Sequence, residues 1–308
     1  MTGNREAPGS RHPGLLGFRI SPTESTGIDW TRLDETWALA GESQALDAGW
    51  LSDHLADASQ ERGGPSVESL TAAAALAHRV PGKWVGIAVV SGTFRHPALV
   101  AKAATVLDHA TGGRFILGLG AGWHPGEHDA FGIALPPIVE RFDRFERGVR
   151  TIAALLSDAA RSEPGVTIDD PIFPLHRATN EPPPLCSGGP PLWIGAQRRR
   201  GIALAVRHAE GWPMPGNRPG DVAYFSERRD TIRRALAGGG RDPDAFTFAA
   251  QLSCGRTAAE RAAALAVAER FVEAGANHVM LGLPAAAAPD GLADVVREVA
   301  EPLRARFG

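Results

Sequence analysis

Residues 84–131 have the sequence WVGIAVVSGTFRHPALVAKAATVLDHATGGRFILGLGAGWHPGEHDAF, and this stretch decides the fold. Trp84–Val90 is an apolar, β-branched run, which is typical of a strand buried on both faces of a parallel sheet. A helix is predicted over residues 97–113, opened by a proline whose missing N–H costs nothing there and closed by a glycine pair. Arg114–Leu119 is a second strand, and a polar, glycine-rich loop follows it. Because ligands bind beyond the carboxyl ends of parallel strands, we expect the chemistry at this loop.

The same alternation of apolar strands and helices runs through the rest of the chain. Further strands are predicted at Leu15–Ile20, Gly49–Ser52, Pro191–Gly195, Glu210–Met214, Phe246–Ser253 and Asn277–Leu283. Helices are predicted at residues 33–46, 66–78, 97–113, 139–155, 202–208, 221–237 and 257–273, with a terminal helix capped by Asp290. This number of repeated βα units favours a closed (β/α)8 barrel of the TIM type over an open sheet.

We expect one barrel domain over residues 14–308. Residues 159–190 interrupt the alternation between the helix after strand four and strand five, and because the alternation then resumes unchanged they are interpreted as an excursion from the barrel. Residues 1–13 are polar and broken by proline and glycine, so a disordered tail is expected. Ser66 is predicted to cap its helix, with Glu68 close to the positive end of the dipole.

Composition excludes several classes of protein. The formal net charge is −3 and no basic run is longer than three arginines, so no nucleic-acid footprint is expected. Cys186 and Cys254 form neither a CxxC pair nor a disulfide framework, which favours a reducing cytoplasm. The first residues lack an apolar core, so neither a signal peptide nor a membrane span is predicted. We therefore expect a cytoplasmic protein with a small-molecule substrate and no nucleic-acid or membrane partner.

Two familiar patterns in the glycine-rich loop fail on inspection. Residues 118–122, GLGAG, resemble a dinucleotide fingerprint, but Trp123 stands where glycine or alanine is required. Residues 124–128 spell the zinc-protease pattern H-x-x-E-H, which needs both histidines on one continuous helix. The Pro125-Gly126 pair is expected to prevent such a helix, so no metal site is predicted. The glycines are predicted instead to let the backbone approach a neighbouring strand or a ligand closely.

Polar residues follow three other strands. His54, after Asp53, could donate or accept a proton beside a redox centre, and the alternative is a surface or hydrogen-bonded structural histidine. Arg95 could pair with a phosphate or carboxylate, or could bond neighbouring loops. Residues 195–201, GAQRRRG, join strand five to a helix N-terminus, which favours a phosphate, with a solvated charge run as the alternative. The remaining histidines interpreted as structural are His78, His109, His176, His208 and His278.

The chain resembles the luciferase-like monooxygenase superfamily, specifically its coenzyme F420 (deazaflavin)-dependent oxidoreductases. The resemblance runs from about Leu15 to the end and is strongest over residues 66–212. The matching phrases are Ser52-Asp53-His54, FRHPALVAKAATVLDHATGGRFILGLGAGWHPGEHDAFGI from Phe94, ERFDRFERGV from Glu140, and PPLWIG followed by ALAVRHAEGW.

That resemblance implies a TIM-type barrel with a flavin-like ring over its C-terminal mouth. It also implies a non-prolyl cis peptide at Ala88–Val89, in a bulge that supports the back of the ring. The residues implied to bind cofactor are Asp53, Ala88, Val89, Ser91, Gly195, Ala196, Gln197 and Arg198, with the cofactor phosphate at the last four. His54 and Glu127 are the implied catalytic residues, and Trp123 and His124 the implied substrate contacts. A homodimer is also expected.

The sequence departs from the family pattern at three places. The second strand is several residues shorter than usual, which leaves the position of His54 open. Trp123 stands where some sugar-phosphate dehydrogenases of the family have a catalytic glutamate, which argues against that substrate. Gln197 and Arg198 replace glycines usual in the phosphate loop.

Three functions remain open at this stage. The first is an F420-dependent oxidoreductase that transfers a hydride to or from a small organic substrate. The second is an FMN-dependent monooxygenase that works with a separate flavin reductase, since FMN in the same seat activates oxygen. The third is a non-catalytic barrel that binds a ligand without turnover. The Asp53-His54 pair favours F420 over FMN.

Overall fold

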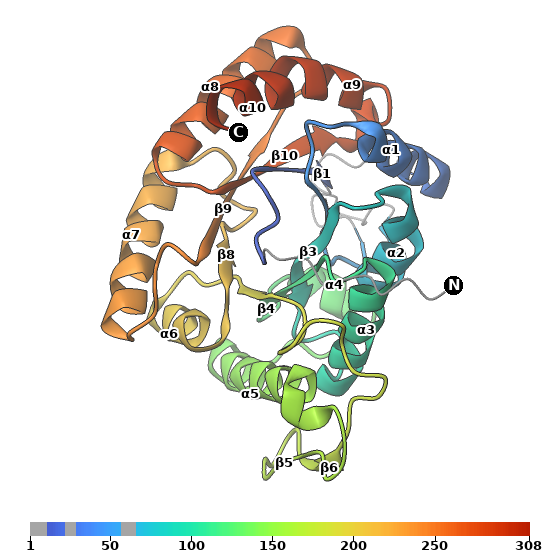
Figure 1. Ribbon diagram of the computed structural model, residues 1–308, viewed down its shortest axis with the longest axis vertical. Coiled ribbons are helices and arrows are strands. Elements are labelled where there is room, and N and C mark those ends of the chain that lie inside the picture. Colours follow the sequence, from blue (N-terminus) through green and yellow to red (C-terminus); the bar gives the residue numbers. More distant parts are fainter. Residues whose placement is uncertain (1–10, 22–28, 57–65) are drawn as a thin grey trace.

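The computed structural model describes residues 11–21, 29–56 and 66–308. Eight parallel strands close into a barrel in the order β1-β10-β9-β8-β7-β4-β3-β2, which confirms the predicted fold (Figure 1). The barrel strands are β1 (Leu16–Ser21), β2 (Ala48–Leu51), β3 (Trp84–Ser91), β4 (Phe115–Gly120), β7 (Leu192–Ile194), β8 (Gly211–Pro213), β9 (Thr247–Ser253) and β10 (His278–Pro284).

Helices alternate with these strands and surround the barrel (Figure 1). They are α1 (Trp30–Glu42), α2 (Ser69–Leu76), α3 (Pro97–Ala110), α4 (Pro125–Ala130), α5 (Ile138–Leu156), α6 (Arg199–His208), α7 (Val222–Gly238), α8 (Ala258–Glu273), α9 (Gly291–Val295) and α10 (Glu301–Phe307). A π-helical turn, Val296–Ala300, joins α9 to α10. None of the described helices is both long and apolar enough to cross a membrane.

Two predicted helix caps are wrong. Glu68, not Ser66, caps α2, because its carboxylate accepts from the backbone N–H of Thr71 at 2.7 Å. The Ser66 hydroxyl instead donates to the carbonyl of His54 at 2.7 Å. Asp290 precedes α9 without a side-chain capping bond. The first error matters for the site. Ser66 bonds the carbonyl of His54 in the loop after β2, and Glu68 bonds Arg95, which pairs with Asp53 in the same loop.

The excursion between α5 and β7 forms a small antiparallel sheet of β5 (Val166–Ile168) and β6 (Leu175–Ala178), which protrudes below α5 in Figure 1. It is tied to the barrel at buried points. The Asn180 amide donates to the Thr105 hydroxyl on α3 at 2.9 Å, and Arg147 on α5 donates to Asp170 at 2.6 Å.

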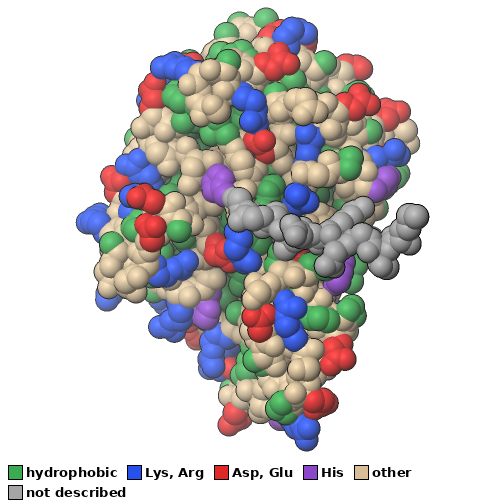
Figure 2. All heavy atoms as spheres, in the orientation of Figure 1, with side chains coloured by type: hydrophobic (Ala, Val, Ile, Leu, Met, Phe, Trp, Pro, Cys, Tyr) green, Lys and Arg blue, Asp and Glu red, His purple; other side chains and the backbone are tan. Residues whose placement is uncertain are grey.

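The last residues of the expected N-terminal tail, from Arg11 onward, contact the barrel domain. Arg11 forms an ion pair with Glu210 at 2.6 Å and donates to the carbonyl of Gly189 at 3.1 Å, and Pro13 is buried. Residues 1–10 of the expected tail lie outside the described residues. On the face drawn in Figure 2, acidic and basic side chains are interspersed without an extended patch of one sign, in keeping with the small net charge.

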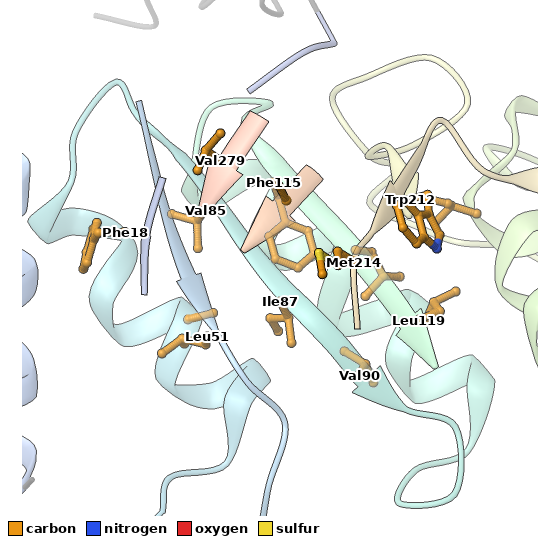
Figure 3. Packing of buried hydrophobic residues seen from close by; sticks show 14 of the residues in the cluster. Phe18, Leu51, Val85, Ile87, Val90, Phe115, Leu119, Trp212, Met214 and Val279 are labelled. Atoms are coloured by element: carbon orange, nitrogen blue, oxygen red, sulfur yellow. The ribbon is translucent and has the colours of Figure 1, made fainter. Parts of the chain in front are cut away.

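The core has two parts, because successive side chains of each strand point to opposite sides of the barrel wall. Outward-facing residues such as Phe18 on β1, Val85 on β3 and Phe115 on β4 form the larger cluster with the helices (Figure 3). Inward-facing residues fill the barrel itself. They are Ala48, Trp50, Trp84, Ile116, Trp193, Ala249 and Met280, with the Trp50 and Trp193 rings 4.8 Å apart.

His278 at the start of β10 completes this inner packing as a neutral imidazole. The indole N–H of Trp50 donates to its Nε2 at 2.9 Å, so Nε2 carries no proton. Its Nδ1 lies 2.8 Å from the Gly14 carbonyl, which can only accept, so Nδ1 carries the proton. Burial lowers the pKa of His278 to about 4. The histidine is structural, as predicted, and its partners come from distant parts of the chain.

We predict that His278 makes the protein less stable in mild acid. The pKa of His278 falls from 6.5 to about 4 on folding, so its contribution is complete above pH 6.5 and is lost as the pH falls toward 4. The loss in the free energy of unfolding amounts to about 3 kcal/mol, because each pKa unit between the unfolded and the folded value is worth about 1.4 kcal/mol. Urea unfolding of His278→Gln, whose amide oxygen can still accept from Trp50, should lack this part of the pH dependence. His176→Gln, at an exposed histidine, is the control and should keep it. Equal slopes for both variants would refute the assignment.

Candidate active site

The predicted site residues come together because they follow neighbouring parallel strands at the same end of the barrel. The loops concerned follow β2, β3, β4 and β7, which are four consecutive strands in the barrel order. The carboxyl ends of all eight strands form the mouth, where barrel enzymes hold their substrates. The short β2 does not displace His54 from this mouth, since its ring reaches the helix that follows β4.

The wall of the mouth on β3 contains the predicted irregularity. The peptide bond between Ala88 and Val89 is cis, which confirms the expected position. The register of β3 against β4 shifts between Ile87 and Val90. Val89 thereby faces the glycines of β4: a Cβ on Gly120 would lie 2.5 Å from its Cγ2.

The glycines of the loop motif therefore serve close approach of a neighbouring strand, one of the two alternatives predicted. A Cβ on Gly118 would overlap the carbonyl oxygen of Ile87, and one on Gly195 would lie 3.7 Å from the Val89 side chain. Gly122 has a φ of +80°, and a Cβ there would meet the hydroxyl of Thr93 at 2.5 Å. Gly118 and Gly120 on β4 make room for Val89.

Asp53 is buried at the end of β2 and anchors the loop that carries His54. One carboxylate oxygen accepts from the Ser69 hydroxyl at 2.6 Å, and the other from the backbone N–H of Ser91 at 2.8 Å. The Arg95 guanidinium pairs with both oxygens, at 2.7 and 2.8 Å, and also bonds Glu68. Arg95 thus bonds neighbouring loops, the second of its two predicted roles. Asp53 and Ser91, predicted to bind cofactor, hold each other through these bonds, and the Asp53 side chain has no exposed surface.

The loop after β4 differs from the prediction, because a helix does begin at Pro125. Proline occupies the first turn of α4, where its missing N–H is not needed, and His124 caps it by accepting from the N–H of Glu127 at 3.0 Å. The expectation that Pro125-Gly126 prevents a helix is therefore wrong. Within the described residues, no group of three histidine, cysteine, aspartate or glutamate side chains is arranged to hold a metal ion.

Glu127 and His54, the two predicted catalytic residues, are in direct contact. His54 Nδ1 lies 3.0 Å from one Glu127 oxygen, and the other oxygen accepts from the N–H groups of Leu55 and of Ala56, the latter at 3.2 Å. Burial of the carboxyl raises the pKa of Glu127, but the bonds from His54 and the two backbone N–H groups outweigh it and hold the pKa below its ordinary value. Glu127 is therefore ionised at neutral pH.

An ionised carboxylate only accepts hydrogen bonds, so the proton of neutral His54 must lie on Nδ1. Its Nε2 is then an acceptor, and it has no hydrogen-bond partner in the described part of the chain. The ring is part-buried, with 18% of its side chain exposed. A carboxylate that fixes the tautomer of an imidazole while the second nitrogen stays open is the arrangement of a general base.

Trp123 and His124, the predicted substrate contacts, form the rim beside this pair. Trp123 is 61% exposed, and its ring meets the rings of His54 and His124 edge-on, at 6.2 and 4.9 Å between centroids. His128 is buried behind them: its Nδ1 donates to the His124 carbonyl at 2.7 Å and its Nε2 bonds Thr93 at 2.7 Å. The rim is therefore tied to the loop after β3.

The loop after β7 leads into α6 and carries the predicted phosphate site. Gly195, Gln197 and Arg198 are exposed, whereas Ala196 is buried and its carbonyl accepts from Trp212 at 2.7 Å. Arg198 occupies the cap position without a side-chain capping bond, so the first N–H groups of α6 stay available to an anion.

Two residues of the mouth were missed by sequence reasoning. Arg19 on β1 donates to the side chain of Gln251 on β9, whose amide N–H donates to the carbonyl of Met214. A signal was present in the sequence, because Arg19 is a charge inside the apolar strand LGFRIS.

Known proteins resemble this chain in sequence and in fold. The family model described as "Luciferase-like monooxygenase" matches residues 14–304. Phthiodiolone/phenolphthiodiolone dimycocerosates ketoreductase of Mycobacterium bovis is 34% identical over 167 residues, which are 54% of this chain and 41% of that protein. F420-dependent glucose-6-phosphate dehydrogenase of Kineococcus radiotolerans is 33% identical over 206 residues, which are 67% of this chain and 58% of that protein. The chain thus spans about half the length of these relatives.

Solved structures show the same fold. An F420-dependent secondary alcohol dehydrogenase in complex with an F420-acetone adduct aligns with a TM-score of 0.72 at 17% identity, covering 94% of this chain and 98% of that one. The EDTA monooxygenase of Chelativorans sp. BNC1 aligns with a TM-score of 0.74 at 15% identity, covering 96% and 94%.

We predict that Gly120→Ala destabilises the protein by about 1–3 kcal/mol, because the added methyl would overlap Val89 in a packed wall. Gly238→Ala at the end of α7 is the matched control, since a Cβ there meets no atom within 4 Å. Both changes restrict the unfolded chain equally, so the difference between them isolates the clash. Chemical denaturation measures it, and equal stability of the two variants would contradict the packing described.

We predict that Glu127→Gln moves the proton of His54 from Nδ1 to Nε2. The Gln oxygen would keep the bonds from Leu55 and Ala56, which places its NH2 group against Nδ1 and forces that nitrogen to accept. Nitrogen-15 NMR of the imidazoles at pH 8 distinguishes the tautomers. His278, held with its proton on Nδ1, is the internal control and should not change. An unchanged His54 spectrum in the variant would rule out Glu127 as the group that fixes the tautomer.

Proposed function

The chain belongs to the luciferase-like monooxygenase family, and from that premise we propose that it is a coenzyme F420-dependent oxidoreductase. The proposed reaction is hydride transfer to or from a small organic substrate. The observation that carries the proposal is the His54–Glu127 pair, in which a part-buried imidazole presents an Nε2 without a hydrogen-bond partner in residues 11–21, 29–56 and 66–308 at the barrel mouth. Hydride transfer to a carbonyl needs a proton for the oxygen, and the reverse reaction needs a base to remove it.

The residues at the mouth fit a deazaflavin. Ala88 and Val89 form a bulged wall on which a flat ring can rest, and the loop of Gly195–Arg198 offers backbone N–H groups and a cation to a phosphate. When bound, the deazaflavin supplies a carbon centre that gives or takes a hydride. The protein contributes binding, orientation and a proton.

His54 would hold and move that proton at Nε2. When Nε2 is protonated the ring carries a positive charge, and ionised Glu127 stabilises it through Nδ1–H. Asp53 and Arg95 would act as positioning residues, because they fix the backbone from which His54 projects. Trp123 covers the outer side of the imidazole and limits its exposure to water.

An FMN-dependent monooxygenase with a separate reductase is the second candidate. The observation in its favour is that the loop after β7 carries Gln197 and Arg198, polar side chains that can bond the terminal phosphate of FMN directly. The non-catalytic barrel is the weakest candidate, because it gives no reason for Glu127 to fix the tautomer of an imidazole that has no other hydrogen-bond partner among the described residues.

The proposal extends to the setting of the enzyme. We propose the cytoplasm, because Cys186 and Cys254 are both free and buried. Burial raises the pKa of Cys186 to about 11 and that of Cys254 to about 12, so neither thiol forms the reactive thiolate at neutral pH. A homodimer is proposed from the family resemblance.

Cofactor titration tests the proposal. We expect coenzyme F420 to bind more tightly than FMN, with Arg198→Met weakening F420 by about tenfold through the loss of one charge-assisted phosphate contact. Arg234→Met, at an exposed arginine of α7, should bind as the wild type does. His54→Ala should bind F420 normally and lose about 10²–10⁴ in turnover. Tight FMN binding without F420 binding would replace this function with the monooxygenase, and binding of neither would leave only the ligand-binding barrel.

A further inference from the structure

Arg19 is unlike Arg95, another arginine at the mouth. Arg95 is matched there by the carboxylates of Asp53 and Glu68. The Arg19 guanidinium, in contrast, has only the neutral amide of Gln251 as its partner among the described residues, and a single nitrogen makes that bond. A guanidinium has five N–H donors, so most of them are left for another acceptor. Burial without a carboxylate lowers the pKa of Arg19 to about 10, which leaves it charged at neutral pH.

The side chain of Arg19 points into the barrel. Two residues earlier, a Cβ on Gly17 would meet the inner residues Trp50 and His278, and alternation along β1 puts Arg19 on the same side. Gln251 follows the inner residue Ala249 by two positions on β9. Its amide is held in one orientation, since Nε2 donates to the Met214 carbonyl and Oε1 accepts from Arg19.

The barrel order places Gln251 opposite the bulge and Arg19 two strands away from it, on the other side of β2. Counting strands around the closed barrel, β9 is four steps from β3 in either direction. A flat group resting on the Ala88–Val89 wall would therefore turn its free face toward Gln251, to which Arg19 is bonded. His54 stands between them, because β2 lies next to both β1 and β3.

We propose that Arg19, oriented by Gln251, binds the carboxylate of an anionic organic substrate at the floor of the mouth. The inference rests on the proposed function, since it names the class of substrate for the same site. A planar guanidinium matches a carboxylate with two parallel hydrogen bonds. One cation balances one negative charge, whereas a doubly charged phosphate would leave one charge unpaired. Among the described residues no carboxylate pairs with this part-buried cation, and a substrate anion would supply one.

The test uses two carboxylates and their neutral amides, which match in size and differ in charge: benzoate with benzamide, and acetate with acetamide. Calorimetric titration of the cofactor-free protein at pH 7.5 should show each carboxylate binding at least tenfold more tightly than its amide. Arg19→Met should abolish this preference and Arg19→Lys should retain part of it. Arg198→Met, which removes an exposed arginine at the loop after β7, should keep it in full.

Folding is checked by the melting temperature without ligand, which should be unchanged or higher in Arg19→Met because an unpaired charge is removed. The proposal is overturned by equal binding of carboxylate and amide to the wild type, by a preference that survives Arg19→Met, or by one that disappears in Arg198→Met. Tighter binding of phenyl phosphate than of benzoate through Arg19 would also overturn the carboxylate class. These outcomes are independent of cofactor titration: loss of the preference with intact F420 binding defeats this inference alone, and failure to bind either cofactor defeats the proposed function alone.

Discussion

The geometry of the mouth depends on the buried ion pair between Asp53 and Arg95. Two residues on different loops, far apart in the sequence, meet with both carboxylate oxygens and two guanidinium nitrogens engaged. Removing one partner of such a pair costs about 3–5 kcal/mol, because the other charge is left buried alone. The ion pair therefore holds the ends of β2 and β3 together. The Ser69 hydroxyl, which donates to Asp53, links the start of α2 to the same pair. His54 follows Asp53 directly, so this pair fixes its backbone independently of the contacts of its own side chain.

The short helix α4 supplies the second half of the arrangement. Its six residues would not be stable as an isolated helix. It is held by side chains at both ends: His124 caps its first turn, and His128 in its last turn bonds Thr93 after β3. Glu127 lies between them and faces the loop after β2, where two backbone N–H groups and His54 converge on its carboxylate. The same helix thus links three loops and orients the proposed base, which explains why Glu127 is buried and charged together.

The sequence was sufficient for the fold because the barrel depends on local patterns. Apolar runs at Trp84–Val90 and Arg114–Leu119, with a proline-opened helix between them, define a βα unit that only a repeated parallel architecture can bury. The contact between His54 and Glu127 could not be derived that way, because 73 residues separate them. It needed the closure of the barrel to bring their loops together. The start of α4 was missed for a local reason: a histidine cap is a weaker sequence signal than serine, threonine or aspartate. The inward direction of Arg19 follows only once the register of β1 against β2 is known.

The charges at the mouth have a consistent order around the barrel. An ionised Glu127 follows β4, the imidazole it orients follows β2, and the uncompensated cation lies on β1, the next strand. A substrate whose carboxylate pairs with Arg19 would extend from β1 past His54 toward the bulge on β3. Its reacting carbon would then lie between the imidazole and the ring wall, and its charged end would lie away from the hydride. Repulsion between the substrate anion and Glu127 is reduced because the carboxylate of Glu127 is already satisfied by two N–H groups and an imidazole. In the proposed arrangement the group that would bind the substrate is separate from the group that would move its proton, so we expect changes on β1 and after β2 to alter substrate selection and chemistry independently.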